Sequence, residues 1–223
     1  MLLNLLLGLG VVYTFGYFWH REKTEVKEHK FRVQRQIEGM DRHHSDIIFI
    51  GDSLIAEGHW PYWFQDLDIA NFGVDASQAQ DIYYRVHQLF HAQPQKIFIM
   101  VGINDLNFSD LTLDFDEAKA FYAKMLERIH REVPGAEVYV HKVLPTTDPW
   151  PRSFTVETLT PLNDFIVMQA QSYGYRVIDL LPVMANESGA LKAAYTDDGL
   201  HLNADGYRVW IDTLRPLLYG ARP

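Results

Sequence analysis

The chain has 223 residues, a formal net charge of −9 at pH 7 and 48% hydrophobic residues. These values predict one globular domain with a sizeable core, with room for an appendage. The acidic balance, without a long basic run interleaved with aromatic residues, argues against a nucleic-acid partner. Because the sequence has no cysteine, disulfides, thiolate metal sites and a cysteine nucleophile are excluded, although the compartment is left open.

Residues 1–19 (MLLNLLLGLGVVYTFGYFW) contain no charged side chain. As a helix, this segment is just long enough to cross the hydrocarbon core of a bilayer, which is about 30 Å thick. Tyr17, Phe18 and Trp19 close it like an interfacial aromatic belt. The early basic residue and the small-residue cleavage site of a signal peptide are not found. We therefore predict an uncleaved, single-pass transmembrane anchor, with a buried N-terminal helix as the alternative.

The flank of this segment bears on which side of the membrane the domain faces. Basic residues follow the segment at positions 21, 23, 27 and 30. The positive-inside rule then favours a cytoplasmic domain, while a periplasmic or other extracytoplasmic domain stays open as the alternative. Residues 20–45 are highly charged with sparse apolar positions, which predicts a helical stalk or linker packed lightly on the domain.

From residue 46 onward, short apolar runs alternate with longer amphipathic stretches. The short runs are rich in Ile, Val, Phe or Tyr and predict strands at residues 46–50, 68–72, 96–101, 137–143 and 175–179. The longer stretches carry apolar residues at helical spacing and predict helices at residues 78–91, 115–132, 159–173 and 204–218. Gly174 stands where a C-terminal helix cap belongs, and Asn203 where an N-cap belongs.

Strands that alternate with helices imply βαβ units with right-handed crossovers. The predicted fold class is therefore α/β: a three-layer, doubly wound, flavodoxin-like parallel sheet of five strands over residues 46–223. A hydrophobic N-terminal helix precedes it. In such sheets the chemistry gathers beyond the carboxyl ends of the strands, so the residues that follow each predicted strand are the candidates for a functional site.

Three predicted strands end in residues that suit acyl-transfer chemistry. Ser53 follows the first strand in Gly-Asp-Ser-Leu, where a nucleophile could sit on a tight turn into a helix with its N–H aimed at an anion. Gly73 follows the second strand and could offer an unhindered N–H, and Asn104 follows the third with an uncharged amide donor. Each residue could instead have an ordinary structural role: Ser53 as a helix cap, Gly73 as a turn glycine and Asn104 in an Asx-turn.

A histidine and a carboxylate lie near the C-terminus, just before the last predicted helix. Asp198 precedes His201 by three residues, so its carboxylate can reach one ring nitrogen around a tight loop. The other ring nitrogen could then take the proton of Ser53 as a general base. Alternatively, Asp198 and His201 are ordinary loop and capping residues. A catalytic role requires that His201 lie close to the end of the first strand, and the doubly wound fold would bring it there.

Together these segments resemble the SGNH (GDSL-type) hydrolase family, whose named residues occur in the order Ser, Gly, Asn, His. They correspond here to Ser53, Gly73, Asn104 and His201, with Asp198 supplying the family's D-x-x-H. The resemblance covers residues 45–218 and is greatest to the branch of platelet-activating-factor acetylhydrolase catalytic subunits and carbohydrate acetylesterases, in the stretches DIIFIGDSL, KIFIMVGINDL, VYVHKVLP and YTDDGLHLNADGY. It implies the SGNH fold, an oxyanion hole of Ser53, Gly73 and Asn104, and no cofactor.

The segment after Gly73 departs from the family pattern. Ala76 and Ser77 stand where many relatives have a second glycine and a threonine. We expect the Gly73 donor to survive, but the shape of the loop, and with it the substrate preference, is in doubt.

Other constellations are poorer matches. The turn at Ser53 lacks the last glycine of G-x-S-x-G, which argues against an ordinary α/β-hydrolase, and there is no Walker A sequence. His87 and His91 are spaced to share a helix face and could grip a metal, but no third ligand stands out, so we predict no metal. With Ser53, Asp198 and His201 all present, a binding module on an inactive fold is also disfavoured.

The alcohol and acyl parts of the substrate are less defined by the sequence. Candidate substrate-binding residues are Asp52 and Leu54 beside the serine, Asp105 after Asn104, and Trp150 in the segment 145–158, which we interpret as a lid or substrate-contact loop. The aromatic residues at positions 60, 62, 63 and 64 could line a pocket or pack the core. The resemblance implies a serine esterase acting on short-acyl, especially acetyl, esters of carbohydrate or lipid. An acyltransferase, a lysophospholipase or a thioesterase are the alternatives.

Overall fold

The computed structural model describes residues 28, 31–33, 35, 36, 39, 44–107 and 115–219. The predicted transmembrane anchor at residues 1–19 lies outside these residues, so the anchor and the side of the membrane stay predictions. Within the described ranges, no helix combines the length and the apolar character needed to cross a bilayer. The described residues between 28 and 39 are helical. Their role as a stalk likewise stays a prediction.

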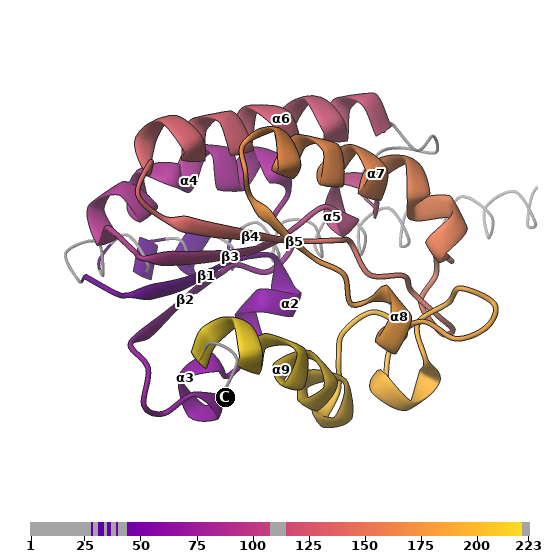
Figure 1. The fold of residues 1–223 in the computed structure, drawn as a ribbon. Helices are drawn as coiled ribbons and strands as arrows, with labels where there is room; N and C mark the ends of the chain where they lie inside the picture. Colours follow the sequence, from indigo (N-terminus) through magenta and orange to yellow (C-terminus); the bar gives the residue numbers. More distant parts are fainter. Residues whose placement is uncertain are drawn as a thin grey trace, which may run out of the picture.

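A five-stranded parallel sheet forms the centre of the domain, as the alternation of strands and helices predicted (Figure 1). The strands run in the order β2-β1-β3-β4-β5, which is the flavodoxin-like order. Gly51 pairs with both Gly73 and Met100, so the carboxyl ends of the first three strands finish level. The strands are β1 (Ile47–Gly51), β2 (Ile69–Gly73), β3 (Lys96–Met100), β4 (Glu137–His141) and β5 (Arg176–Ile178).

Helices cover both faces of the sheet, with α4, α6 and α7 on one face and α2, α3 and α9 on the other (Figure 1). The four long helices were predicted: α4 (Ala79–Ala92), α6 (Phe115–Glu132), α7 (Val156–Ser172) and α9 (Ala204–Tyr219). The short ones are α2 (Ser53–Ala56), α3 (Trp60–Trp63), α5 (Ile103–Asn107), α8 (Leu181–Met184) and the 3₁₀ turn η1 (Ala193–Tyr195). Apart from the turn after Ser53, the short helices were not predicted, because so few residues carry no helical periodicity.

Helix caps explain where the long helices begin and end. The α7 helix starts three residues before its predicted position because Thr155 caps it and exchanges hydrogen bonds with Thr158. Gly174 follows α7 with a φ of +71°, the left-handed conformation expected of a terminating glycine. Asn203 caps α9, as predicted, by accepting the N–H groups of Asp205 and Gly206.

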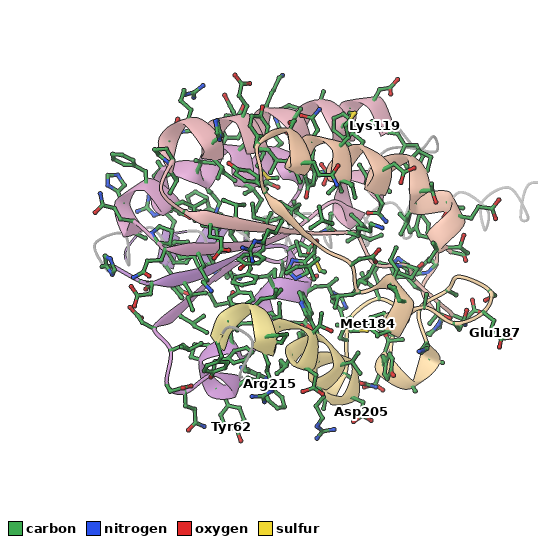
Figure 2. All side chains as sticks on the ribbon, viewed as in Figure 1. Tyr62, Lys119, Met184, Glu187, Asp205 and Arg215 are labelled. Carbon is green, nitrogen blue, oxygen red and sulfur yellow. The ribbon has the colours of Figure 1, made fainter. Side chains whose placement is uncertain are left out.

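The core has two halves because alternate side chains of each strand point to opposite faces. Ile48 and Ile50 join the cluster under α4, α6 and α7, whereas Ile47 and Phe49 join the cluster under α2, α3 and α9. Figure 2 shows side chains filling the space between the sheet and both helix layers. Burial on both faces is why these strands are nearly continuous apolar runs.

Candidate active site

The predicted nucleophile, Ser53, lies on a sharp turn between β1 and α2. Gly51 makes this turn possible, since a Cβ there would meet the carbonyl oxygen of Met100 at 2.0 Å. Asp52 caps α2, and Ser53 is the first residue of that helix. Its Oγ lies 3.0 Å from Nε2 of His201, although the two residues are 148 positions apart. The fold therefore brings the predicted nucleophile and the predicted base within hydrogen-bond distance.

Asp198 holds the imidazole of His201 from the other side. Oδ2 of Asp198 lies 2.6 Å from Nδ1 of His201, while its Oδ1 accepts the backbone N–H groups of Leu200 and His201. A proton on Nδ1 leaves Nε2 as an acceptor for the Ser53 hydroxyl. Partial burial acts to raise the pKa of Asp198, but the hydrogen bonds from His201 and the backbone outweigh it and lower the pKa. Asp198 is thus kept ionised beside the imidazole.

The loop that carries His201 rests on the predicted substrate-contact segment, 145–158. Gly199 has a φ of +90°, and a Cβ there would meet the carbonyl oxygen of Thr147 at 2.0 Å. Its own carbonyl accepts the N–H of Thr147 at 2.8 Å. The Trp150 ring stands edge-on to the His201 ring, with centroids 6.2 Å apart. Trp150 therefore lies at the site, in a segment that is hydrogen-bonded to the catalytic loop.

Asn104, the predicted amide donor, is buried in the first turn of α5. Its Nδ2 donates one hydrogen to the backbone carbonyl of Ser77 at 3.1 Å, and the backbone carbonyl of Asn104 accepts from Nε2 of Gln78 at 3.3 Å. Because an amide nitrogen carries two hydrogens, this anchoring leaves a second one to donate. Asp105, predicted to contact substrate, instead accepts the N–H of Ala79 with both oxygens at the start of α4.

Gly73, the predicted second oxyanion donor, ends β2 and lies against α2. Its N–H already donates to Oδ1 of Asn71 at 2.9 Å. A Cβ on Gly73 would meet the backbone nitrogen of Ala56 at 2.2 Å, so glycine is needed for β2 to approach α2. An oxyanion could receive the Gly73 N–H only by competing with Asn71. The structure therefore weighs against Gly73 as a ready donor and gives it a packing role.

The side chain of Asn71 was not singled out by the sequence, although it organises this region. Its Nδ2 lies 3.0 Å from the carbonyl of Ile55, 3.1 Å from that of Ala56 and 3.0 Å from that of Gly58. These carbonyls end α2, where a helix leaves its acceptors unsatisfied. Asn71 thus fixes the helix that begins with the predicted nucleophile.

Asp52 and Leu54, predicted to bind substrate, are only 1% and 3% exposed. Oδ1 of Asp52 accepts the N–H of Leu54 at 3.1 Å, which makes Asp52 the cap of α2. Burial raises the pKa of Asp52 to about 7, and among the described residues its Oδ2 has no hydrogen-bond partner. Because both side chains are buried where α2 begins, we no longer predict that they contact the substrate.

Glu57 is an acidic residue at the site that the sequence analysis missed. Its Oε1 lies 4.0 Å from Nε2 of His201, on the same side as Ser53. Partial burial raises the pKa of Glu57; His201 acts to lower it, while Asp75 and Asp198 raise it further. The signal that could have found it is its position four residues after Ser53, which places it one helical turn from the nucleophile.

The aromatic residues after the nucleophile divide between core and surface. Trp60 and Phe64 are fully buried, and Trp60 stacks on Phe49 with centroids 4.3 Å apart. Tyr62 is exposed and points away from the domain (Figure 2). For Trp60 and Phe64 the core alternative is therefore correct, and an acyl or sugar pocket made by these two side chains is not supported.

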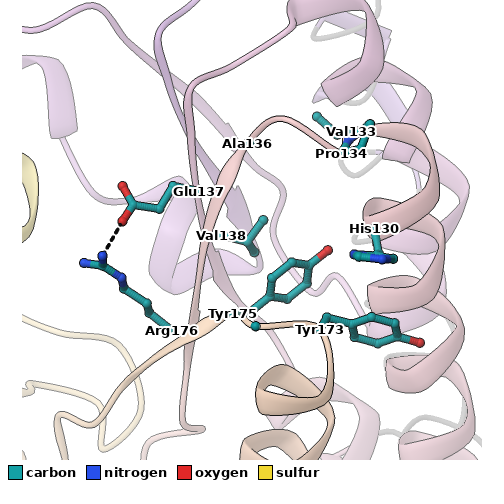
Figure 3. A pocket seen from close by; sticks show the side chains of 10 residues that line it. His130, Val133, Pro134, Ala136, Glu137, Val138, Tyr173, Tyr175 and Arg176 are labelled. Atoms are coloured by element: carbon teal, nitrogen blue, oxygen red, sulfur yellow. Dashed lines mark ion pairs between the residues drawn. The ribbon is translucent and has the colours of Figure 1, made fainter.

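A surface cavity of about 280 Å³ lies away from these residues (Figure 3). It is lined by His130, Tyr173 and Tyr175 and by Glu137 and Arg176, which form an ion pair at 3.0 Å. Glu137 and Arg176 are the first residues of β4 and β5, so the cavity opens at the amino ends of the strands. Ser53 follows the carboxyl end of β1, which places the cavity at the opposite edge of the sheet from the candidate active site.

His87 and His91, considered as metal ligands, both lie on α4 with their rings 6.4 Å apart. In the part of the chain that the structure describes, no cluster of three or more His, Cys, Asp or Glu residues could hold a metal ion. The site around Ser53 can act through its side chains alone: a hydroxyl, an imidazole that accepts its proton, and a carboxylate that orients the imidazole.

The parallel α/β fold and this Ser–His–Asp arrangement define a serine hydrolase. The model of the GDSL-like Lipase/Acylhydrolase family matches residues 49–209, and the chain belongs to that family. It is accordingly a serine ester hydrolase, which confirms the resemblance drawn from the sequence.

Solved structures share the fold at low sequence identity. A candidate platelet activating factor structure from Streptococcus pneumoniae has 22% identity and a TM-score of 0.81, covering 92% of this chain and 99% of that one. A GDSL-like lipase from Bacteroides thetaiotaomicron has 20% identity and a TM-score of 0.68, covering 82% and 91%. An acetyl xylan esterase has 20% identity and a TM-score of 0.64, covering 77% and 98%.

A curated relative matches only in part. The chain is 26% identical over 171 residues to an N-acylneuraminate cytidylyltransferase from Escherichia coli O18:K1:H7. The match covers 74% of this chain and 38% of that protein, so the chain spans well under half of the relative's length.

Proposed function

We propose that this protein is a serine esterase that removes short acyl groups, acetyl above all, from a carbohydrate or lipid alcohol. The observation that carries the proposal is the position of His201, with Nε2 3.0 Å from Oγ of Ser53 and Nδ1 2.6 Å from Oδ2 of Asp198. The likeness to an acetyl xylan esterase supports a carbohydrate ester.

Acylation begins when Nε2 of His201 takes the hydroxyl proton of Ser53 and Oγ attacks the ester carbonyl carbon. The carbonyl π electrons move to oxygen, and Asp198 stabilises the imidazolium that has formed. Collapse of the tetrahedral intermediate breaks the bond to the alcohol oxygen, which receives the proton from Nε2 and leaves. The acyl group is then held as an ester on Ser53.

Two donors are positioned for the oxyanion. Ser53 begins α2, and within the described residues no acceptor takes its N–H. Asn104 offers the second hydrogen of its anchored amide. The Gly73 N–H becomes a third donor when its hydrogen bond to Oδ1 of Asn71 is replaced by one to the oxyanion. Donors fixed before the reaction are effective because they need no reorganisation as charge develops.

Deacylation repeats these steps with water. His201 takes a proton from water, the hydroxide oxygen attacks the acyl carbon, and Ser53 leaves as the protonated alcohol while the carboxylic acid is released. A sugar or lipid hydroxyl in place of water would make the same acyl-enzyme a transferase. The product mixture formed with a competing alcohol distinguishes the two outcomes.

The test compares the wild type with Ser53→Ala on a series of 4-nitrophenyl esters of increasing acyl length, on acetylated xylo-oligosaccharide and on lysophospholipid. We expect turnover of the acetyl esters to be highest and the variant to lose at least about 10³-fold in kcat. Ser172→Ala, which changes an exposed serine at the end of α7, is the matched control. Ester hydrolysis by Ser53→Ala at the wild-type rate would overturn the proposal.

A further inference from the structure

The carboxylate of Glu57 lies beside the candidate reacting pair, Ser53 and His201. Oε1 of Glu57 is 4.0 Å from Nε2 of His201, and Oγ of Ser53 is 3.0 Å from the same nitrogen. The side chain of Glu57 is 46% exposed, so a substrate in solvent can reach it. Because Nε2 protonates the leaving alcohol, the oxygen of that alcohol must come within hydrogen-bond distance of Nε2 and therefore close to Glu57.

The backbone holds Glu57 in this place. Its N–H donates to the carbonyl of Ser53 at 2.9 Å, closing one turn of α2. The carbonyls of the residues on either side, Ala56 and Gly58, contact Nδ2 of Asn71. The Leu54 carbonyl accepts the phenol of Tyr207 at 2.8 Å. The carboxylate is thus presented from a fixed helix end rather than from a mobile loop.

Two of the three charged groups that act on Glu57 are carboxylates. Asp75 and Asp198 both act to disfavour its ionised form, while His201 favours it. Asp198 is itself bonded to His201 at 2.6 Å. A negatively charged group on the alcohol part of an ester would therefore approach the reacting atoms against carboxylates on both sides of the imidazole.

We propose that Glu57 makes the enzyme select substrates by charge. Esters of uncharged alcohols, such as acetylated neutral sugars, are preferred over esters whose alcohol carries a carboxylate or phosphate near the scissile bond. This inference rests on the proposed esterase function. For a substrate anion roughly 8 Å from the Glu57 carboxylate, at an effective dielectric constant of about 20 to 40, Coulomb's law gives a discrimination of about 5- to 30-fold. Acetylated xylan would be accepted on this basis, and an O-acetylated N-acylneuraminate, which carries a carboxylate, would be disfavoured.

The experiment measures kcat/KM for a matched pair of acetate esters, 3-acetoxybenzamide and 3-acetoxybenzoate, which differ in the charge on the leaving alcohol. The readout is the ratio of the neutral to the anionic substrate within one enzyme preparation, which cancels the fraction of folded enzyme. We expect the wild type to favour the amide, Glu57→Gln to lower the ratio by about 5- to 30-fold, and Glu57→Lys to lower it further. Glu187→Gln, at an exposed residue with no described contact to Ser53, Asp198 or His201, should leave the ratio unchanged.

Salt adds an independent readout. In about 1 M NaCl the wild-type preference should shrink towards that of Glu57→Gln, because the Debye length falls to about 3 Å. A Glu57→Gln ratio within twofold of the wild type, or a wild type that does not discriminate, would overturn the inference and leave the esterase proposal intact. A wild type that hydrolyses neither ester nor any acetylated sugar would instead count against the proposed function.

Discussion

The two faces of the sheet are packed by different kinds of side chain. Under α4, α6 and α7 the buried cluster is mostly aliphatic, with residues such as Leu126 and Ile129 fully covered. Under α2, α3 and α9 it is aromatic: Trp60, Phe49, Phe98 and Tyr139 stack in sequence, with neighbouring ring centroids 4.3 to 4.7 Å apart. Both faces bury apolar area, which drives folding without specifying direction.

The aromatic face adds bonds that do have direction. The indole N–H of Trp60 donates to the carbonyl of Ile55 at 2.9 Å, and the phenol of Tyr207 donates to that of Leu54 at 2.8 Å. Both acceptors belong to α2, the helix that begins with Ser53. We infer that the aromatic face positions the nucleophile as well as providing stability, whereas the aliphatic face makes no comparable bond to α2 among the described residues.

The largest effect is expected at the site itself. Asp198→Asn should lower kcat by about 10³- to 10⁴-fold, because an amide can hold the imidazole with its proton on the wrong nitrogen. Thermal unfolding should change little, since Asp198 is on a partly exposed loop. Asp197→Asn, one residue away and exposed, is the matched control and should keep wild-type kcat. An Asp198→Asn enzyme with wild-type turnover would remove Asp198 from the proposed triad.

The sheet and its order could be predicted because they follow from local pattern. Each strand is an apolar run, and observed bounds differ from predicted ones by at most two residues, as at β4. That Ser53, His201 and Asp198 lie close together was also predicted, because each follows a strand or precedes a helix at a recognisable spacing, while their catalytic roles stay predictions. Parallel topology then brings Ser53 and His201 together without further information.

What the sequence could not reveal depends on contacts between distant segments. That Asn71 caps the end of α2, and that Gly73 must be glycine for β2 to pass close to that helix, follows only from how the two segments pack. Likewise Asp52 seemed a substrate contact because it adjoins Ser53, yet capping of α2 turns it inward. A residue next to a nucleophile in sequence need not share its exposure, since a tight turn directs neighbouring side chains to opposite sides.

On the aliphatic face, Leu126→Ala should lower the free energy of unfolding by about 2–5 kcal/mol, because Leu126 is fully buried in α6 and its removal leaves a cavity. Turnover per folded molecule should stay within about twofold, since no hydrogen bond among the described residues joins the aliphatic face to α2. Denaturant unfolding and active-site titration measure the two quantities. Met168→Ala, on the exposed side of α7, should change neither. If Leu126→Ala lost turnover at denaturant concentrations where it is still folded, the aliphatic face would also affect the nucleophile, and the proposed difference between the faces would be wrong.

On the aromatic face, pH should act through a buried histidine. His141 accepts the indole N–H of Trp210 at Nε2, 3.0 Å away, and Nδ1 lies 2.9 Å from the carbonyl of Ile99. Burial lowers its pKa to about 4, only partly offset by the bond to Ile99. The unfolded chain therefore binds a proton between about pH 6.5 and 4 that the folded protein does not, so this part of the stability is complete above pH 6.5 and is lost as pH falls.

The expected size of this loss is about 3 kcal/mol on going from pH 7 to 4. It is measured as the difference between the wild type and His141→Gln in urea unfolding at each pH. Taking the difference matters because Asp52, whose pKa is raised to about 7 by burial, contributes the opposite slope: its stabilisation is lost as pH rises. A parallel pH dependence in both proteins would show that His141 is not the group that titrates.

The smallest effect is expected from removing one buried tyrosine hydroxyl on each face of the sheet. Tyr207→Phe removes the hydrogen bond to the Leu54 carbonyl and leaves a buried acceptor, so it should cost about 1–2 kcal/mol of stability and lower kcat a few-fold by loosening α2. Tyr122 is equally buried on the aliphatic face, but in the described part of the chain its hydroxyl has no hydrogen-bond partner. Tyr122→Phe should therefore be neutral or stabilising and leave kcat unchanged. Equal losses of turnover in the two variants would mean that both faces position Ser53, because the same atom is removed from each and only its bond to α2 differs.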